Sequence, residues 1–355
     1  MGEAPGENEE KLGIPFVGAS GKELDRMLSE AGWNPGSIYM TNVFHTRPPS
    51  NNLQHFMVSA KEWKRSLPTA GSAKPPAETP SSSGSTVLPP LKLDNKIFHL
   101  HPNLYPELER LQREIEEVNP NLILALGNTA LWFLTGKQNI SSMRGTTLNS
   151  QPISGRSYKV LPTYHPAAVL RQWDLRPIVV ADLMKARRQA EFPEIRRPCR
   201  RILHSPTIGD VQQYLAAMAP AKPLAVDIET RLGQITEIGF AQDPTLALVV
   251  PFIRGFKDHY WGSLGEEVAA LRLVRAILSH PCPKVFQNGL YDIQYIWKTW
   301  GFPPRNCVED TMIRHHSLFP ELPKGLGFLG SIYTDEPAWK IMRNKKDTQE
   351  KRDDE

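Results

Sequence analysis

Four residues in the first half of the chain have side chains suited to a reaction on a nucleobase. They lie in short polar segments: Glu3 in GEAPG, Phe16 in PFVG, Asn42 in TN and His165 in YHP. An aromatic ring can hold a base that has left the DNA stack, and an amide can bind the hydrogen-bonding edge of that base. A carboxylate can orient or deprotonate water, while an imidazole can stabilise negative charge on a departing base. The combination therefore suits a reaction in which a base is held outside the stack and departs.

Each of these residues also has an ordinary structural interpretation. Glu3, near the start of the chain, could be a solvated acid, and Phe16 could belong to a hydrophobic core. Asn42 could cap a turn, and His165, which precedes a proline, could be a hydrogen-bonded loop residue. No single residue assigns the site, so the interpretation depends on the set.

A second set of candidate residues is acidic and lies in the second half of the chain. In LAVDIETR, Asp227 and Glu229 are two residues apart on an expected strand, so their carboxylates point to the same side. Paired carboxylates can hold two divalent cations for attack on a phosphodiester. QNGLYDIQYI adds Asp292 near the start of a helix, and VEDTM adds Asp310. The alternative is that the first two are exposed acids on an edge strand, and the DxE spacing alone does not separate these readings.

The elements that would position the first set alternate between strand and helix. β-rich segments predict strands at 38–44 and 121–127, and the apolar spacing of 21–32 predicts an amphipathic helix that ends at a glycine. This alternation predicts an α/β fold with three layers, in which helices cover both faces of a parallel sheet. Loops that leave the carboxyl ends of parallel strands share one edge of the sheet. The loops GEAPGENEE, TNVFHTRPP and TYHPAAVL should therefore converge on one crevice.

The second half opens with a strand, a turn and a strand, and then alternates between helices and strands. It therefore predicts a mixed sheet with helices. A Pro-, Ser- and Gly-rich stretch and a proline-broken basic stretch mark the expected insertion and joint. We expect two domains at 1–190 and 219–340, a disordered insertion at 69–90, a basic joint at 191–218 and a charged tail at 341–355.

Composition narrows the class of protein. The chain has 355 residues, of which 40% are hydrophobic and 23% charged, so it can bury sizeable cores. Its formal charge of +4 permits a polyanionic partner without requiring one. The three cysteines are far apart, which favours reduced thiols over a disulfide framework. The sequence contains neither a signal peptide nor an apolar run of about 20 residues, so we expect a cytoplasmic protein of a bacterium or a phage-infected cell.

The order of four segments adds to this interpretation. GEAPGENEEKLGIPFVGASGKELDRML, TNVFHTRPP, LALGNTAL and LPTYHPAAVLR closely resemble family-4-type uracil-DNA glycosylases over about residues 1–190. The resemblance implies that Glu3 activates water and that His165 supports the leaving uracilate. It further implies that Phe16 stacks on the flipped uracil and that Asn42 binds its edge, with the loop after the histidine wedged into the DNA. Arg47 and Arg171 are expected to contact phosphates.

Two features depart from that family. Its members typically hold an iron–sulfur cluster on four cysteines, but residues 1–190 contain no cysteine, so we expect no cluster. The strand that precedes GEAPG in the family is absent here, apart from Met1. Loss of a central parallel strand should remove the anchor of the loop that carries Glu3. This favours either a start that is recorded wrongly or a degenerate module.

The acidic set resembles the DnaQ-like (RNase H-like) 3′–5′ proofreading exonucleases of family A DNA polymerases, over about residues 220–340. DIET matches the first motif and NGLYD the second. By this resemblance Asp227, Glu229 and Asp292 are ligands of Mg²⁺ or Mn²⁺, whereas Asp310 is not a usual ligand. The third motif, a Tyr or His before a catalytic Asp, is not found, because Asp347 and Asp353 lack that partner.

We therefore predict an incomplete exonuclease domain and an overall role in DNA repair or replication. Uracil excision would be coupled to a polymerase-type exonuclease module, as in a bacteriophage-type polymerase of which this chain forms an N-terminal portion. The expected partners are DNA and a polymerase domain encoded downstream, with no membrane. Two alternatives stay open: a non-catalytic module that senses uracil or a modified base, and a truncated polymerase fragment.

Overall fold

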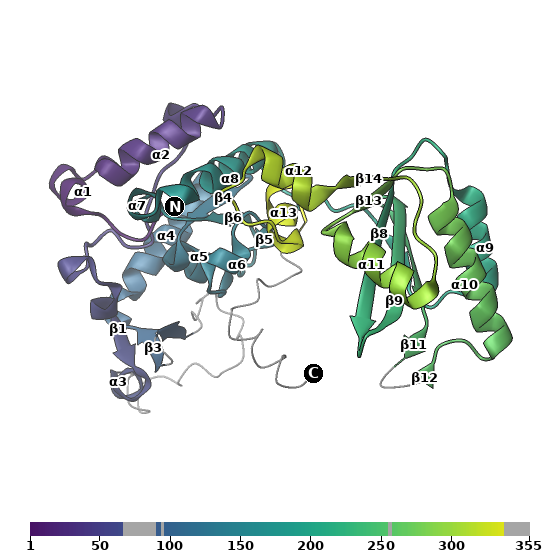
Figure 1. Cartoon of the computed structure of the whole chain (residues 1–355). Helices are drawn as coiled ribbons and strands as arrows, with labels where there is room; N and C mark the ends of the chain where they lie inside the picture. The colour runs from purple at the N-terminus through teal and green to yellow at the C-terminus, as the bar shows by residue number, and fades with distance from the viewer. Residues whose placement is uncertain (67–89, 94–95, 255–257, 337–355) are drawn as a thin grey trace. The chain divides into compact units, whose positions relative to one another are not determined.

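The computed structural model describes residues 1–66, 90–93, 96–254 and 258–336 (Figure 1). The described residues form two compact units, the first within Met1–Arg196 together with 330–336 and the second within Arg197–Leu329. The expected insertion, except its last residue, and the expected charged tail lie outside the described residues, as do Asp347 and Asp353. Within the described ranges, no helix combines the length and the apolar character needed to cross a bilayer.

The first unit is built around a short parallel ladder. Strand β4 (Ile123–Leu126) pairs in parallel with β6 (Lys159–Thr163), and β5 (Leu148–Asn149) adds an antiparallel edge to β6. On the other side of β4, the backbone of Met1 and Gly2 lies between β4 and the segment around Asn42. The carboxyl ends of these parallel segments therefore lie along one edge, as the alternating sequence pattern predicts.

The start of the chain is anchored on both sides, which corrects the expectation that the loop carrying Glu3 has lost its support. The Met1 amine donates to Leu124 O at 2.9 Å, and Leu126 N donates to Met1 O at 2.9 Å. On the opposite side, Gly2 N donates to Thr41 O at 2.9 Å and Val43 N donates to Gly2 O at 3.0 Å. Two residues thus make the hydrogen bonds of a central parallel strand, because each of their polar backbone groups finds a partner.

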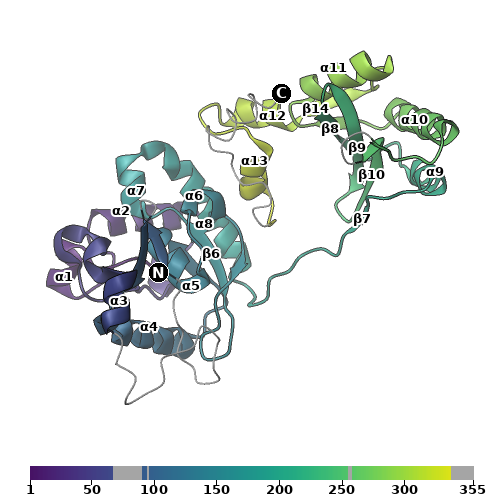
Figure 2. The same cartoon turned by 90° about the horizontal axis from the view of Figure 1, so that it is seen from below.

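Helices cover both faces of this ladder, which confirms the three-layer α/β/α fold. Successive residues of β4 point to opposite faces. Ile123 and Ala125 join a core with α4 and α5, while Leu126 joins a second core with α2, α7 and α8. Figure 2 shows α2 and α8 on one side of β6 and α4 on the other. The helices are α1 (Glu7–Leu12), α2 (Ala19–Glu30), α3 (Ala60–Ser66), α4 (Tyr105–Val118), α5 (Asn128–Thr135), α6 (Ile140–Met143), α7 (Pro166–Arg171) and α8 (Arg176–Gln189).

Two parts of the first unit differ from a regular strand-and-helix alternation. No regular strand forms at 38–44, where a strand was expected, and the segment pairs through a single bridge between Asn42 and Gly2. A separate antiparallel sheet precedes α4, with β1 (Met57–Ser59), β3 (Lys96–Leu100) and β2 (Leu91–Leu93) in that order. Short 3₁₀ helices connect the elements at Pro35–Ser37, Pro49–Asn51, Leu53–Phe56, Pro102–Leu104 and Trp173–Leu175.

The second unit contains a six-stranded mixed sheet in the order β14-β13-β8-β9-β10-β7. Strand β9 is antiparallel to both β8 and β10, whereas β13 is parallel to β8 and β14 is parallel to β13. Leaving out β7, the strands follow the order 5-4-1-2-3 by position in the chain, with only the second antiparallel, which is the RNase H-like arrangement. The strands are β7 (Arg201–Leu203), β8 (Leu224–Arg231), β9 (Gln234–Asp243), β10 (Leu246–Pro251), β13 (Lys284–Phe286) and β14 (Cys307–Asp310).

Alternation along β8 separates the core of the second unit from a polar face. Val226 and Ile228 are buried, whereas the alternating residues Asp227 and Glu229 are exposed. The sequence pattern of a strand with both acids on one side is therefore confirmed at this element. The other helices of this unit are α9 (Ile208–Ala217), α10 (Leu264–Ser279), α11 (Gly289–Trp300) and α12 (Thr311–Leu318), and a hairpin is formed by β11 (Ile253–Arg254) and β12 (Asp258–His259). Helix α13 (Leu326–Tyr333) begins in this unit, and its residues from Gly330 onward belong to the first unit.

Candidate functional site

A cavity of about 530 Å³ lies in the first unit where the predicted loops converge. Its lining includes Glu3, Phe16, Asn42 and His165, which are the four residues of the first sequence set. Gly127 and Asn128 border it directly after β4, and Tyr164 and His165 border it directly after β6. The cavity thus opens at the carboxyl ends of the parallel strands. Further lining residues are Ala4, Pro5, Gly6, Glu9, Ser20, Pro48, Asn51, Leu126, Ile140, Ala167, Ala168 and Arg171.

Two glycines allow Phe16 and Asn42 to approach each other at this cavity. A Cβ atom on Gly2 would lie 2.5 Å from Asn42 Oδ1 and 2.7 Å from the Phe16 ring, so only glycine leaves room for both side chains. A Cβ atom on Gly21 would lie 1.6 Å from the backbone oxygen of Phe16. Phe16 itself has a φ of 59°, a strained conformation for a residue with a side chain. Close backbone packing therefore fixes the position of the aromatic ring.

Glu3 is held by both its backbone and its side chain. Its backbone oxygen accepts a hydrogen bond from Phe44 N at 2.9 Å. Its carboxylate accepts a hydrogen bond from the hydroxyl of Thr129, a residue with 4% exposure in the first turn of α5. The sequence interpretation did not include Thr129, although it is the residue after Asn128 in the LALGNTAL segment. One carboxylate oxygen is thus fixed by the protein, which orients the other.

His165 is held in a neutral form with a defined tautomer. Its Nδ1 accepts a hydrogen bond from Ala167 N at 3.2 Å, at the start of α7. Because a neutral imidazole carries one proton, that proton lies on Nε2. Burial lowers the pKa of His165 to about 4, with smaller contributions from the Met1 amine and Arg171. The ring centroid lies 6.3 Å from that of Phe16, and both residues line the cavity.

The two arginines expected to contact phosphate occupy different positions. Arg171 lines the cavity at the end of α7. Arg47 is not among the lining residues, and instead donates to Asn51 Oδ1 at 2.8 Å and pairs with Glu10 at 3.2 Å. Asn51 does line the cavity, so Arg47 is one side chain removed from it. Phosphate binding by either arginine stays a prediction.

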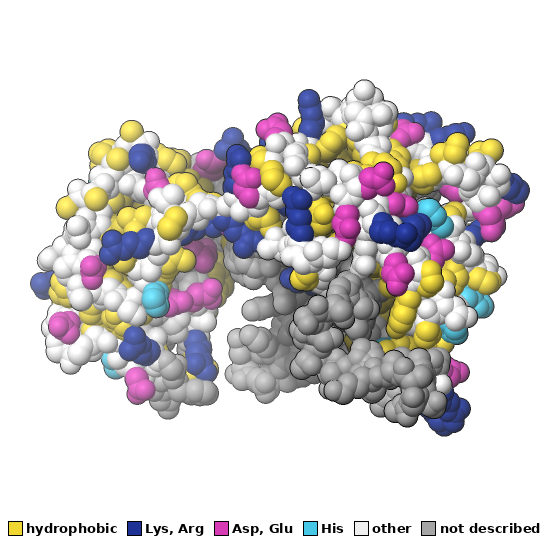
Figure 3. Space-filling view, turned by 180° about the vertical axis from the view of Figure 1, so that it is seen from behind, with side chains coloured by type: hydrophobic (Ala, Val, Ile, Leu, Met, Phe, Trp, Pro, Cys, Tyr) yellow, Lys and Arg dark blue, Asp and Glu magenta, His cyan; other side chains and the backbone are white. Residues whose placement is uncertain are grey.

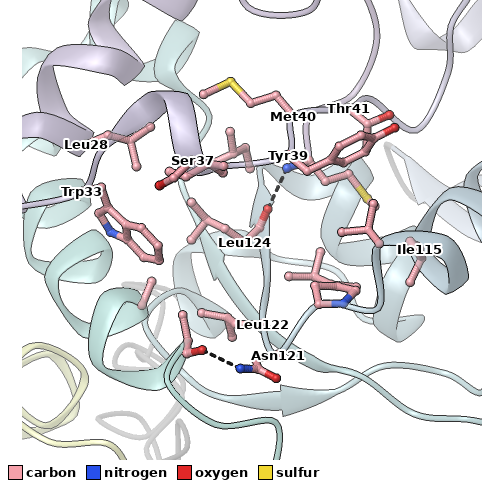
Figure 4. A pocket seen from close by; sticks show the side chains of 18 of the residues that line it. Leu28, Trp33, Ser37, Tyr39, Met40, Thr41, Ile115, Asn121, Leu122 and Leu124 are labelled. Carbon is pink, nitrogen blue, oxygen red and sulfur yellow. Dashed lines mark hydrogen bonds between the residues drawn. The ribbon is translucent and has the colours of Figure 1, made fainter.

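A second cavity, of about 360 Å³, has a different character (Figure 4). Figure 4 shows mostly aliphatic and aromatic side chains around it, among them Leu28, Trp33, Tyr39 and Leu124. The hydrogen bond between Asn121 Nδ2 and Ala190 O, at 3.0 Å, lies at its edge. Phe16 and Leu126 line both cavities. This second cavity offers little of the polar chemistry found around Glu3 and His165.

The acidic residues of the second unit are only partly brought together. Asp292, on α11, has 4% exposure and accepts a hydrogen bond from Ile228 N at 3.1 Å, which places it beside β8. Burial raises the pKa of Asp292 to about 6, and the charges of Asp227 and Asp310 add to the shift. Asp310 accepts hydrogen bonds from Gly289 N at 2.7 Å and Met312 N at 2.8 Å, so its carboxylate links the starts of α11 and α12.

These positions do not make a metal site as they stand. Carboxylate oxygens are suitable ligands for Mg²⁺ or Mn²⁺. Within the part of the chain that the structure describes, however, no three His, Cys, Asp or Glu side chains lie close enough to hold a metal ion. Asp292 instead binds a backbone N–H of β8. Ligation of a metal ion by Asp227, Glu229 and Asp292 stays a prediction.

Comparison with known proteins assigns the first unit. Residues 1–191 match the family described as the uracil DNA glycosylase superfamily. The chain belongs to this superfamily. It is 32% identical over 191 residues to a type-4 uracil-DNA glycosylase of Thermotoga maritima, covering 53% of this chain and 74% of that protein. It is 30% identical over 206 residues to the type-4 enzyme of Sulfurisphaera tokodaii, covering 55% of this chain and 70% of that protein.

Outside the glycosylase region, the chain resembles solved structures only weakly. The catalytic core of RRP6 from Trypanosoma brucei matches with 17% identity and a TM-score of 0.31, covering 41% of this chain and 39% of that one. We therefore assign the RNase H-like fold of the second unit from its own strand order. Fusion to a family A polymerase is not established by these comparisons.

Proposed function

We propose that the first unit removes uracil from DNA by hydrolysing the bond between base and sugar. The observation that carries the proposal is the cavity of about 530 Å³ in which Glu3, Phe16, Asn42 and His165 meet. A volume of this size accommodates a flipped base with part of its nucleotide. The relatives named type-4 uracil-DNA glycosylases support uracil as the base.

Binding of the base depends on Phe16 and Asn42. The Phe16 ring supplies an apolar surface for the face of the flipped base, and its backbone is held by close packing with Gly21. Asn42 has 5% exposure, so its amide is pre-positioned when it binds the polar edge of uracil. A buried amide selects a base with complementary groups, since a base without them leaves the amide unpaired.

Cleavage depends on His165 and Glu3. As the bond to the sugar breaks, negative charge develops on uracil, and the Nε2–H of neutral His165 donates a hydrogen bond to the oxygen that receives it. The Glu3 carboxylate, held by Thr129, orients a water molecule for attack on the sugar carbon and accepts the proton that this water loses. The uracilate that leaves takes up a proton from solvent. The products are free uracil and an abasic site in the DNA.

Release of free uracil tests the proposal. Wild-type protein should release uracil from a single-stranded oligonucleotide with one deoxyuridine, and Glu3→Gln should reduce the rate by at least about 100-fold. If wild-type protein released uracil no faster than Glu3→Gln does, the proposal would be contradicted. Tight binding of the same oligonucleotide without release would instead identify a uracil-sensing module. A parallel oligonucleotide with a modified pyrimidine tests whether another base is preferred.

For the second unit we propose descent from a polymerase-type 3′–5′ exonuclease that acts beside a family A DNA polymerase. The support is the DIET and NGLYD resemblance and the placement of both β8 acids on one exposed face. Because the predicted ligands do not group, we expect weak or no digestion of a DNA 3′ end with Mg²⁺ or Mn²⁺. Robust digestion that Asp227→Ala abolishes would overturn this expectation.

The partner and the place of action are part of the same proposal. A DNA repair protein of this kind would act in the cytoplasm of a bacterium or a phage-infected cell. Co-purification of the chain from such cells with a DNA polymerase, and sensitivity of that complex to mutation of the second unit, would support the partnership. Recovery of the chain free of any polymerase would oppose it.

A further inference from the structure

Three charged side chains of the first unit are buried together beside the end of β6. Arg144, Asp182 and Lys185 have exposures of 2%, 1% and 1%. Figure 3 shows Lys, Arg, Asp and Glu side chains spread over the face of the molecule that it displays, where water can hydrate them. Burial of an ionised group costs free energy unless the group is paired and hydrogen-bonded. The partners of these three residues therefore show what the cluster holds in place.

The pair formed by Arg144 and Asp182 is bound to the end of β6. Arg144 Nε donates to Asp182 Oδ2 at 2.9 Å, and Arg144 Nη2 binds the other carboxylate oxygen. The hydroxyl of Thr163 donates to the same Asp182 Oδ2 at 2.6 Å. Thr163 is the last residue of β6 and lies two residues before His165. The buried pair thus holds the end of the strand from which the loop with His165 leaves.

The Lys185 ammonium joins this cluster to a distant part of the chain. It donates to Gly145 O at 2.8 Å and to the backbone oxygens of Ser331 and Thr334. An ammonium has three N–H groups, so each has an acceptor, and segment 330–336 supplies two of the three. Ser331 lies in the last turn of α13, where carbonyls lack partners within the helix and a cation is favourable. Segment 330–336 is therefore built into the first unit.

The hydroxyl of Ser331 links this segment directly to the buried pair. Arg144 Nη1 donates to Ser331 Oγ at 2.7 Å. Gly145 permits the close approach, since its φ is 70° and a Cβ atom there would lie 2.6 Å from Asp182 Oδ1 and 3.0 Å from Ser331 O. Two guanidinium nitrogens thus bind the Asp182 carboxylate and the third binds the hydroxyl. The Ser331 hydroxyl therefore helps to fix the plane in which the guanidinium meets the carboxylate.

We propose that Ser331 is a positioning residue for His165. It orients the Arg144 guanidinium, which orients Asp182, and the Asp182 carboxylate holds Thr163 at the end of β6. The inference rests on the base excision proposed for the first unit. It adds that the excision unit is discontinuous, because it requires a segment that follows the second unit in the chain. Loosening this contact slows cleavage and leaves binding of the base unchanged.

Single-turnover kinetics test the proposal. Ser331→Ala should lower the rate of uracil release by about 10-fold, less than the about 100-fold cost of a misplacement of about 1 Å. Ser331→Thr keeps the hydroxyl and should retain the wild-type rate within about 2-fold. Binding of an oligonucleotide with one 2′-fluoro-substituted deoxyuridine, which resists cleavage, should also stay within about 2-fold of wild type in both variants.

The matched control is Ser317→Ala. The Ser317 hydroxyl donates to Ile313 O at 3.0 Å on α12 of the second unit, so this variant also removes a helix hydroxyl and should leave the rate unchanged. The proposal would be overturned by a wild-type rate in Ser331→Ala or by an equal loss in Ser331→Thr. A loss of binding as large as the loss of rate would overturn it too, because that result indicates general disruption of the unit.

A double variant tests whether Ser331 acts through the buried pair. Thr163→Val removes the hydroxyl that binds Asp182 and keeps the shape of the side chain. If both hydroxyls act along one path, the double variant of Ser331→Ala and Thr163→Val should match the slower single variant within about 2-fold. Independent effects would multiply, and multiplied losses would contradict the path.

NMR of the histidine rings separates the positioning of His165 from the proposed excision. Ser331→Ala should shift the ring signals of His165, assigned by comparison with His165→Ala, whereas Ser317→Ala should not. Unshifted signals in Ser331→Ala would contradict the positioning role. If wild-type protein released no uracil but Ser331→Ala shifted these signals, the proposed excision would fail and the positioning of His165 would stand.

Discussion

In each unit a group from another element binds the carboxylate of a candidate site residue, but the two carboxylates differ in their surroundings. Glu3 borders an open cavity, and a hydroxyl from Thr129 binds its carboxylate. Asp292 has 4% exposure, and a backbone N–H from β8 binds its carboxylate. The first arrangement leaves a carboxylate oxygen available to substrate, whereas the second uses the carboxylate to join a helix to a sheet. Similar residue types are thus positioned for chemistry in one unit and for packing in the other.

The largest effect that separates the units is expected at His165. His165→Ala removes the hydrogen-bond donor that we propose stabilises charge on uracil, so we expect the rate of uracil release to fall by about 100-fold to about 1,000-fold. The control is Asp227→Ala in the second unit, which should leave uracil release unchanged. Single-turnover release from a deoxyuridine oligonucleotide measures both. A comparable loss in the two variants would remove the distinction between the units.

A smaller loss of kcat/KM is expected when a methyl group is added at Gly2, next to the cavity. Gly2→Ala places a methyl group 2.5 Å from Asn42 Oδ1 and 2.7 Å from the Phe16 ring, so both side chains must move. Misplacement of binding groups by about 1 Å costs about 100-fold in rate. Gly36→Ala is the matched control, because its new methyl group would meet only Asn34 Oδ1, at 3.5 Å. Similar kcat/KM values for the two variants would show that the Gly2 contacts do not position the site.

Asp292→Asn sharpens the comparison through stability. The pKa of Asp292 is raised to about 6, above its unfolded value, so its ionised form disfavours the folded state above pH 6. Asparagine keeps an acceptor for Ile228 N without the charge. We expect the second unit to gain about 1–3 kcal/mol at pH 8, measured by denaturant unfolding. The gain should vanish below about pH 4, where the aspartic acid is neutral in both states. Destabilisation at pH 8 would show that the charge supports the fold.

The smallest effect is spectroscopic and concerns the protonation of His165. Its pKa is lowered to about 4, so the imidazole should stay neutral from pH 5 to pH 8. The sign of the shift also means that His165 costs stability as the pH falls from 6.5 towards 4. NMR titration of the histidine ring signals, assigned by comparison with His165→Ala, measures the midpoint. A midpoint near 6.5 would contradict the neutral donor.

The sequence predicts that its four candidate residues share one crevice, and the structure places all four at one cavity. Their roles stay predictions. Glu3, Phe16, Asn42 and His165 all border one cavity, although only the extended segment at 38–44, and no regular strand, carries Asn42. Thr129 was not predicted, since a hydroxyl that binds Glu3 from another element has no local signal. Nor did the pattern predict that the backbone of Met1 and Gly2 bonds to β4 on one side and to the segment around Asn42 on the other, because backbone hydrogen bonds do not depend on residue type.

In the second unit the sequence predicts the faces of β8 but not the grouping of the acids. Asp227 and Glu229 share an exposed face because alternation along a strand is a local property. Whether Asp292 joins them depends on the position of α11, and in the structure its carboxylate binds Ile228 N. The spacing of residues along one strand therefore determines to which face their side chains point. The distance between side chains on two different elements depends on how those elements pack.

A structure of the protein with bound substrate tests the central claim most directly. The probe is a duplex with one 2′-fluoro-substituted deoxyuridine, whose bond between base and sugar resists hydrolysis. We predict that uracil lies in the cavity of about 530 Å³, against the Phe16 ring and within hydrogen-bond distance of His165 Nε2. Phe16 also borders the apolar cavity of about 360 Å³. Uracil in that second cavity, or retained in the duplex, would contradict the account.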